Sequence, residues 1–249
     1  MIVPQLCITA DDYGIGRGVN AAIEQLAAMG RLQAVSVMVH EGAELDTLDT
    51  LRATGAALGI HLVFDERPGG YKRALGRIAV PGAMAKLAAE LEAQIERYLA
   101  LGLPLDFVNS HEHVHVIPRV WRQTVQLAER YGAKAIRSAA FRPVRMSRDG
   151  ALALASRASW SRRPARGMRV MSPLAPVGAG RVTVTGIAER IDMAGDGSEL
   201  IPELVTHPAA DDAVYGGDGE NRLGDFDALR SDALGALLAE RAVTLVKPV

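Results

Sequence analysis

Short apolar runs alternate along the chain with longer segments that carry apolar residues at helical spacing. The short runs predict strands at residues 2–10, 34–39, 57–64, 106–117 and 133–139. The longer segments predict helices at residues 19–30, 44–55, 81–102 and 118–132. Pro81 near the start of one helix, with Gly30 and Gly102 at helix ends, supports these boundaries. Alternation of this kind is typical of parallel βα units.

The second half of the chain is less regular. Residues 141–180 are rich in Arg, Ser, Pro and Gly, with one helix-like piece at 151–159. Strands are predicted again at 182–188, 199–208 and 243–248, with a last helix at 229–242. No linker divides the chain. We therefore expect a single distorted, TIM-like (β/α) barrel over residues 1–249, with about seven βα units and an Arg-rich insertion or lid at about 138–175.

Composition narrows the class of protein. A net charge of -1 over 249 residues gives no overall attraction to nucleic acid or to a membrane surface. No apolar stretch approaches the roughly 20 residues of a membrane helix. The single cysteine, Cys7, lies in an apolar run and predicts a buried, inert thiol. Met1 leads directly into the first strand without a signal-like segment, so a cytoplasmic protein is expected.

Acidic and imidazole side chains stand where several predicted strands end. Asp11 and Asp12 close the first strand, His61 lies near the end of the third, and His207 follows a late one. In parallel barrels the carboxyl ends of strands carry the functional groups. Neighbouring residues of a strand point to opposite sides, so the two carboxylates should differ in role, although a turn at Gly14 could aim both inward. The alternative is a strand-ending turn in which an aspartate caps a helix.

Three histidines alternate through the fourth predicted strand. On a strand, His111, His113 and His115 would share one face, which three imidazoles make unsuitable for an apolar core. The end members would lie about 13 Å apart, so all three cannot bind one ion. One histidine is expected to bind a metal with His61 and an aspartate, and the others to orient it or line the pocket. Such ligands suit Zn²⁺ or another first-row divalent ion, with Mg²⁺ left open.

The segments ADDYG, GIHL, SHEHVHVIP, IRS and THP, in this order from residue 6 to about 210, resemble the YdjC-like carbohydrate deacetylases. This family includes chito-oligosaccharide deacetylases and hopanoid-biosynthesis-associated deacetylases. The resemblance implies Asp11 as general base and Asp12, His61 and His111 as ligands of one divalent metal ion. It implies His207 as the acid or an electrostatic partner. Further residues expected to contact substrate or support the ligands are Tyr13, Asn109, His113, His115 and Arg137.

The activity implied is a metal-dependent hydrolysis that removes the acetyl group from an N-acetylated sugar or sugar conjugate. Two alternatives stay open: hydrolysis of a phosphoester or another amide at the same site, and a non-catalytic sugar-binding relative. The resemblance implies an aspartate at the position where this chain has Asn109. The resemblance also suggests a homodimer.

One region adds a hint about the substrate. Residues 137–169 hold nine arginines against one acidic residue, Asp149. Such a segment could attract an anionic sugar, or it could be a solvated insertion. Aromatic residues make up only 4% of the chain, which favours a small substrate over a long glycan.

Overall fold

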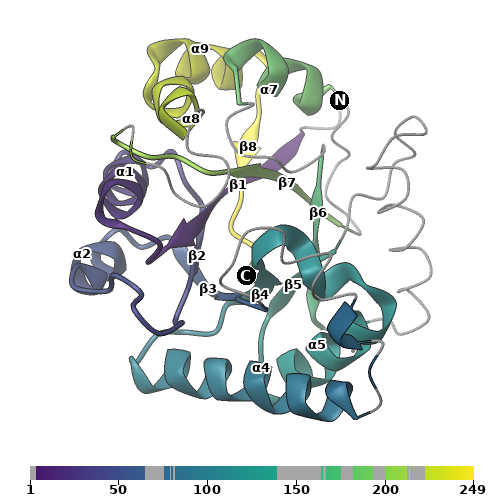
Figure 1. Cartoon of the computed structure of the whole chain (residues 1–249). Helices are drawn as coiled ribbons and strands as arrows, with labels where there is room; N and C mark the ends of the chain where they lie inside the picture. The colour runs from purple at the N-terminus through teal and green to yellow at the C-terminus, as the bar shows by residue number, and fades with distance from the viewer. Residues whose placement is uncertain are drawn as a thin grey trace.

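The computed structural model describes residues 4–64, 76–78, 80, 82–138, 164, 167–174, 182–192, 200–211, 213 and 222–249. Within them, parallel strands alternate with helices. Figure 1 looks into the resulting barrel, with strands at the centre and helices around them. The predicted fold class, a distorted TIM-like (β/α) barrel, is confirmed.

Seven strands close into a ring, and an eighth joins it from outside. The ring runs in the order β1 (Gln5–Tyr13), β2 (Ala34–Val37), β3 (Ala57–Leu62), β4 (Phe107–Ser110), β5 (Ala135–Arg137), β6 (Arg169–Pro173) and β7 (Ile201–Thr206). Parallel pairing of β1 with both β2 and β7 closes it. The short β8 (Thr244–Leu245) pairs with Gln5 and Leu6 at the start of β1. A common TIM barrel has eight strands in its ring, so this barrel is one unit smaller.

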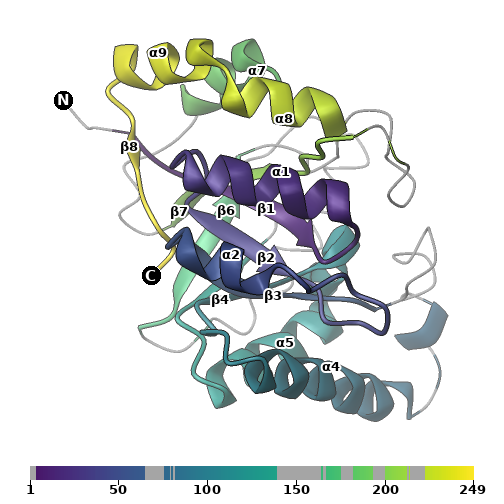
Figure 2. The same cartoon turned by 90° about the vertical axis from the view of Figure 1, so that its left-hand side faces the viewer.

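Helices cover the outside of the ring. They are α1 (Arg17–Ala28), α2 (Leu48–Ala53), α4 (Ala83–Ala100), α5 (Pro118–Arg130), α7 (Val184–Ile191), α8 (Arg222–Arg230) and α9 (Asp232–Glu240). A short 3-10 helix, η1 (His111–Val116), lies between β4 and α5. Figure 2 shows α1 and α2 in front of β1 and β2, whose arrowheads point to the right, away from the C-terminus. The carboxyl ends of the strands therefore gather at the end of the barrel that faces the viewer in Figure 1.

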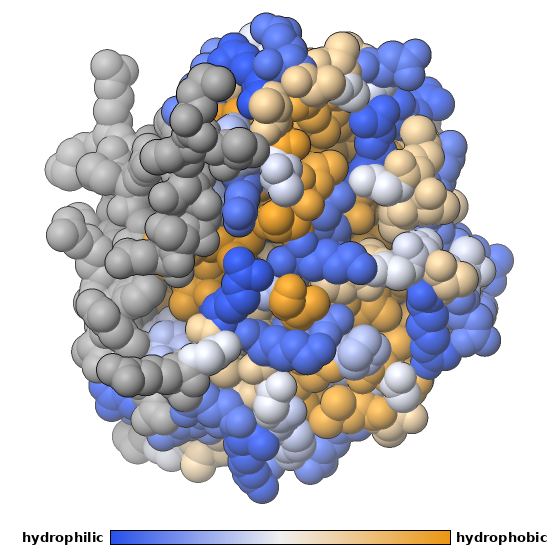
Figure 3. Space-filling model, turned by 180° about the vertical axis from the view of Figure 1, so that it is seen from behind, coloured by the Kyte–Doolittle hydropathy of each residue, from blue (hydrophilic) through white to orange (hydrophobic). Residues whose placement is uncertain are grey.

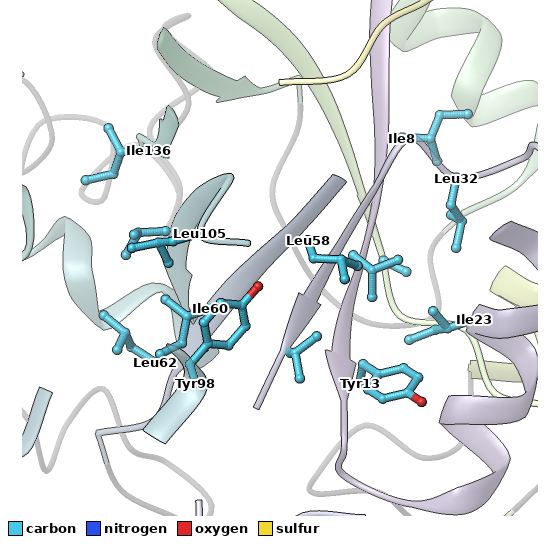
Figure 4. Packing of buried hydrophobic residues seen from close by; sticks show 14 of the residues in the cluster. Ile8, Tyr13, Ile23, Leu32, Leu58, Ile60, Leu62, Tyr98, Leu105 and Ile136 are labelled. Carbon is cyan, nitrogen blue, oxygen red and sulfur yellow. The ribbon is translucent and has the colours of Figure 1, made fainter. Parts of the chain in front are cut away.

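Side-chain alternation along the strands separates two buried layers. The outer layer packs strands against helices, as Figure 4 shows for Ile60 and Leu62 of β3 beside Tyr98 of α4. A second cluster takes one residue from each ring strand: Cys7, Ala34, Ala57, Phe107, Ala135, Met171 and Ile201. Small residues opposite large ones fill the narrow interior, as in other packed barrels. The base of the barrel is thus sealed by hydrocarbon, and the polar groups lie further along the same strands.

The base carries the chain's one thiol, and burial raises the pKa of Cys7 well above its usual range. Figure 3 shows the back of the molecule, where hydrophobic residues reach the surface between polar ones. In the part of the chain that the structure describes, no helix has the length and apolar character needed to cross a bilayer.

Three predicted elements were wrong. Residues 182–188 were expected to form a strand, but Val184–Ile191 is a helix, capped by the Thr183 side chain, which accepts a hydrogen bond from the Gly186 amide. β-branched residues favour strands, but the capping threonine outweighs them here. An Arg-rich insertion was expected at about 138–175, but residues Arg169–Pro173 form the barrel strand β6. The end of the expected range therefore belongs to the barrel and not to an insertion. The helix-like piece at 151–159 lies outside the described residues. The third difference, at the histidine run, affects the site and is described there.

Candidate functional site

A bulge at the end of β1 brings two adjacent carboxylates into the same mouth. The register between β1 and β2 shifts between Ala10 and Tyr13, and Asp12 adopts a left-handed backbone with φ of 70°. An inserted residue bends a strand and redirects its side chains, and aspartate tolerates this conformation better than most residues. Asp11 keeps the inward direction of the strand and Asp12 turns in beside it. Both are buried.

Asp12, His61 and His111 form a compact set of ligand atoms. Asp12 Oδ1 lies 3.1 Å from His61 Nε2 and 3.0 Å from His111 Nδ1. The ligand atoms of the three residues lie within 4.8 Å of one another. They come from the ends of β1 and β3 and from the residue after β4, so barrel closure brings together positions far apart in the sequence.

The orientation of the His61 ring is determined by Asn109. Its Oδ1 lies 2.7 Å from His61 Nδ1, while its Nδ2 donates to Asp11 Oδ1 at 3.2 Å. An amide oxygen can only accept, so His61 Nδ1 donates to it, and the ring is held with Nε2 toward Asp12, the nitrogen that would bind a cation. A carboxylate at position 109 could not donate to Asp11 and would repel it.

Arg222 at the start of α8 occupies the other oxygen of Asp12. Its Nη2 donates to Asp12 Oδ2 at 2.6 Å, and both side chains are almost fully buried. Asp12 therefore offers Oδ1 alone to the two histidines. Burial opposes the charged form of Asp12, but His111 and Arg222 together hold its pKa well below its usual range. The Asp12 carboxylate in turn raises the pKa of His111, although burial acts to lower it.

Asp11 lies beside this set in a separate network. Arg137 Nη1 donates to Asp11 Oδ2 at 2.6 Å, and Arg137 Nη2 donates to Asp11 Oδ1 at 2.9 Å. The Ser36 hydroxyl also donates to Oδ1. Burial opposes the charge of Asp11, but the adjacent guanidinium outweighs it and holds the pKa of Asp11 well below its usual range. Asp11 is therefore an anion throughout the neutral range.

Glu203 of β7 completes the network from below. Arg137 Nε donates to Glu203 Oε2 at 2.9 Å, and Arg137 Nη2 to Oε1 at 2.8 Å. The Arg137 side chain is 0% exposed, so its charge is neutralised entirely by protein groups. Ser36 and Glu203 did not appear among the sequence candidates. Each is a polar residue inside an otherwise apolar strand, and that departure from the pattern was the signal available.

His207 lies beside Asp11. Its Nε2 lies 4.0 Å from Asp11 Oδ2. Its Nδ1 is buried and has no hydrogen-bond partner among the described residues. Burial lowers the pKa of His207 more strongly than the nearby carboxylates raise it. The ring is therefore neutral near pH 7, and it becomes a comparatively strong acid once protonated.

The histidine run is not a strand, and this corrects the sequence interpretation. β4 ends at Ser110, and residues 111–116 turn as η1, with left-handed φ at Glu112 and His113. The Ser110 hydroxyl accepts the His115 amide at 3.1 Å and contacts His115 Nδ1 at 2.6 Å, which stabilises a turn in place of an extended chain. The three histidines therefore do not alternate along one face of a strand. Strict alternation over a short segment cannot by itself distinguish a strand from a turn.

The members of this run then separate in role. His111 faces Asp12, whereas His115 is fully buried with Nε2 3.0 Å from the Arg137 carbonyl oxygen. Burial and the Arg137 charge lower the pKa of His115 to about 3, so its ring is neutral and structural. His113 is half-buried and lies edge-on to His115.

Tyr13 does not reach the ligand set. Its hydroxyl donates to Glu24 at 2.8 Å and lies 2.9 Å from Thr47, on the helix side of the sheet, where Figure 4 shows it beside Ile23. Because strand alternation resumes after the bulge, the tyrosine points away from the mouth that Asp12 enters.

The residues present fit a divalent cation. Two imidazole nitrogens and one carboxylate oxygen are common ligands of Zn²⁺ and related ions, and bonds of about 2.0–2.2 Å could span this set. Among the described buried groups, the carboxylates of Asp11, Asp12 and Glu203 face two guanidinium groups, from Arg137 and Arg222. These five residues alone leave an excess of one negative charge, which a cation beside Asp12 would complement.

Comparison with known proteins gives a consistent assignment. A carbohydrate deacetylase of Geobacillus stearothermophilus is 28% identical over 98% of this chain and 97% of its own. A chitooligosaccharide deacetylase of Enterobacter sp. (strain 638) is 25% identical over 96% of both chains. A match to a carbohydrate deacetylase of Brevibacillus brevis is 31% identical but spans only 51% of this chain and 56% of that one.

Among solved structures, a protein of Enterococcus faecalis V583, described as a candidate cellobiose-phosphate cleavage protein, has a TM-score of 0.73. It covers 99% of this chain and 98% of its own at 18% identity, so it supports the fold alone. The family model for YdjC-like proteins matches residues 5–240. This chain belongs to the YdjC-like protein family.

Proposed function

We propose that this protein is a metal-dependent hydrolase that removes the acetyl group from an N-acetylated sugar or sugar conjugate, releasing acetate and an amino sugar. One observation carries the proposal: Asp12, His61 and His111 lie within 4.8 Å of one another while the neighbouring Asp11 is held apart by Arg137. The full-length relatives named as carbohydrate and chitooligosaccharide deacetylases support it.

Asp12, His61 and His111 would hold the ion. A bound divalent cation would polarise the acetamide carbonyl and lower the pKa of a water molecule. The ligand set favours Zn²⁺ or a related first-row ion over Mg²⁺, because two of the three ligand atoms are imidazole nitrogens. Asn109 orients His61 so that Nε2 can bind the ion, and Arg222 binds Asp12 Oδ2 so that Oδ1 can bind it.

Asp11 would accept the proton of the attacking water. Its Oδ1 already accepts hydrogen bonds from Ser36, Asn109 and Arg137. Its Oδ2 accepts only from Arg137 among the described residues, so a lone pair remains on the oxygen that faces His207. Because the pKa of Asp11 is held low, the carboxylate is always ready to accept but binds the proton weakly. A weakly held proton is easily passed on.

His207 would protonate the departing sugar nitrogen. Its lowered pKa makes the imidazolium a stronger acid than an exposed histidine. Because the His207 ring is neutral at rest, it would first receive the proton that Asp11 takes from the attacking water, relayed by a water molecule across the 4.0 Å between Asp11 Oδ2 and His207 Nε2, and would then pass it to the departing nitrogen. Both groups end the turnover in the state in which they began. Arg137 keeps Asp11 in place during this cycle.

The test is release of acetate from a panel of N-acetylated mono- and disaccharides, neutral and anionic. We expect release that disappears on chelation and returns with added Zn²⁺ or another first-row ion. Asp11→Asn and Asp12→Asn should each abolish it, whereas Asp232→Asn, an equal change of charge at an exposed position of α9, should not. Release that persists after chelation and in Asp11→Asn, or the absence of release from every substrate, would contradict the proposal.

A further inference from the structure

The first turn of α8 holds the segment that carries His207. The amide of His207 donates to Asp225 Oδ2 at 2.9 Å, and the amide of Ala209 donates to the Arg222 carbonyl oxygen at 3.2 Å. Two amides at alternate positions are therefore bound by one helical turn, where β7 has already ended at Thr206. Beyond the end of β7, the first turn of α8 thus accepts the backbone hydrogen bonds that a neighbouring strand accepts within the sheet.

Asp225 binds a second loop at the same time. Its Oδ1 accepts the Val182 amide, just before α7, at 3.1 Å, and its side chain is 0% exposed. A buried carboxylate that accepts backbone N–H groups makes strong, directional bonds. Asp225 therefore fixes the end of β7 against the loop that enters α7.

The His207 ring depends on this backbone attachment. Its Nδ1 has no hydrogen-bond partner within the described part of the chain, and its Nε2 lies 4.0 Å from Asp11. Unlike His61 and His115, whose rings are bound by side-chain or carbonyl oxygens, the ring of His207 is placed mainly by where its backbone lies.

The same helical turn also holds a carboxylate of the ligand set. Arg222, three positions before Asp225, donates to Asp12 Oδ2 at 2.6 Å. Residues three apart lie on one face of a helix. One face of α8 thus binds the Asp12 side chain and the His207 backbone together, so the helix determines the distance between them.

We infer that Asp225 is a positioning residue that sets the place of His207 relative to Asp11 and Asp12, an inference that rests on the proposed function for its effect on catalysis. Asp225 acts on the site through the backbone amide of His207. Displacing His207 by about 1 Å is expected to lower kcat by roughly 10- to 100-fold while KM changes little.

Asp225→Asn tests this, because the amide keeps the shape but can accept on one side only. We expect the fall in kcat just described, with the dissociation constant for Zn²⁺ measured on the metal-free protein unchanged within about twofold, because Arg222 is intact. Asp225→Glu, which keeps the carboxylate, should retain more of kcat. Ser231→Ala removes the N-cap of α9, whose hydroxyl accepts the Leu234 amide at 3.2 Å, and is the matched control for lost stability.

A readout independent of turnover is the NMR spectrum of histidine-labelled, metal-free protein, with His207 assigned by His207→Gln. Asp225→Asn should move the amide and ring resonances of His207 but not those of His115, and Ser231→Ala should move neither. Unchanged His207 resonances in Asp225→Asn, or an equal loss of kcat in Ser231→Ala, would overturn the inference. So would failure of both Asp225 variants to fold while Ser231→Ala folds. If the wild type deacetylates nothing, the proposed function fails, and the spectrum still decides whether Asp225 places His207.

Discussion

Arg137 binds Asp11 through two hydrogen bonds, of 2.6 and 2.9 Å, while the same guanidinium binds Glu203. Removing one partner of a buried ion pair leaves the other charged and unsolvated, which costs about 3–5 kcal/mol. Arg137→Met should therefore lower the free energy of unfolding by about that amount, measured by urea titration. Arg137→Lys should recover only part, since a single ammonium cannot make the paired contacts of a guanidinium. A loss below about 1 kcal/mol in Arg137→Met, as for an exposed pair, would contradict this interpretation.

Asn109 should control the affinity for the cation through His61. Loss of a group that orients a ligand histidine typically reduces metal affinity by about 10- to 100-fold. We expect Asn109→Ala to show a loss of this size for Zn²⁺ by calorimetry on metal-free protein. Asn109→Asp keeps an acceptor for His61 Nδ1 but places a second carboxylate about 3.2 Å from Asp11 Oδ1, so it should lower stability more than affinity. An affinity unchanged in Asn109→Ala would show that His61 is oriented without the amide.

His115 should make the protein sensitive to mild acid. Its pKa is lowered to about 3 in the folded state, against about 6.5 in the unfolded chain. Between these values the unfolded chain binds one more proton, so stability rises with pH, by about 1.4 kcal/mol per pH unit. His115→Gln should reduce this slope by about one proton between pH 4.5 and 6, measured by urea titration at each pH. The variant is expected to be less stable overall, and only the slope bears on the prediction. A slope equal to that of the wild type would show that His115 does not cause the sensitivity.

Gly59 of β3 should be intolerant of a side chain. A Cβ there would lie 2.5 Å from the Phe107 carbonyl oxygen and 2.6 Å from its ring. Overpacking of this kind typically costs about 1–3 kcal/mol, so Gly59→Ala should lower the melting temperature by several degrees. The same substitution at Gly224 of α8 meets nothing within 4 Å and should stabilise the helix by up to about 1 kcal/mol. Equal effects at the two positions would contradict the packing argument.

Much of the barrel was predictable because its strands are buried on both sides and read as short apolar runs, as at 57–64 and 133–139. The errors arose where local hydrogen bonds outweigh the pattern. Ser110 stabilises a turn through His115, and Thr183 caps a helix in a β-branched segment. β6 was missed because its five residues, Arg169–Pro173, hold only two that are strongly apolar.

The residues of the site could be predicted from the sequence better than the contacts among them. Residue types and strand ends indicated the acidic and imidazole groups, and the structure brings Asp12, His61 and His111 together. Nothing in the sequence predicts that Asn109 bridges His61 and Asp11, or that Asp225 binds the His207 amide. These contacts join residues that are far apart in the sequence. Such long-range pairings follow from ring closure and cannot be deduced from local pattern.

The pairing of β1, the first strand, with the late strands β7 and β8 as well as with β2 has a consequence for synthesis and assembly. The two aspartates leave the ribosome early, but their partners Arg137, His207 and Arg222 emerge much later. A nascent chain lacking its last helices would leave Asp12 without its partner Arg222. We therefore expect the site to form only after residues 222–245 have been synthesised, and a fragment without them to lack the proposed activity.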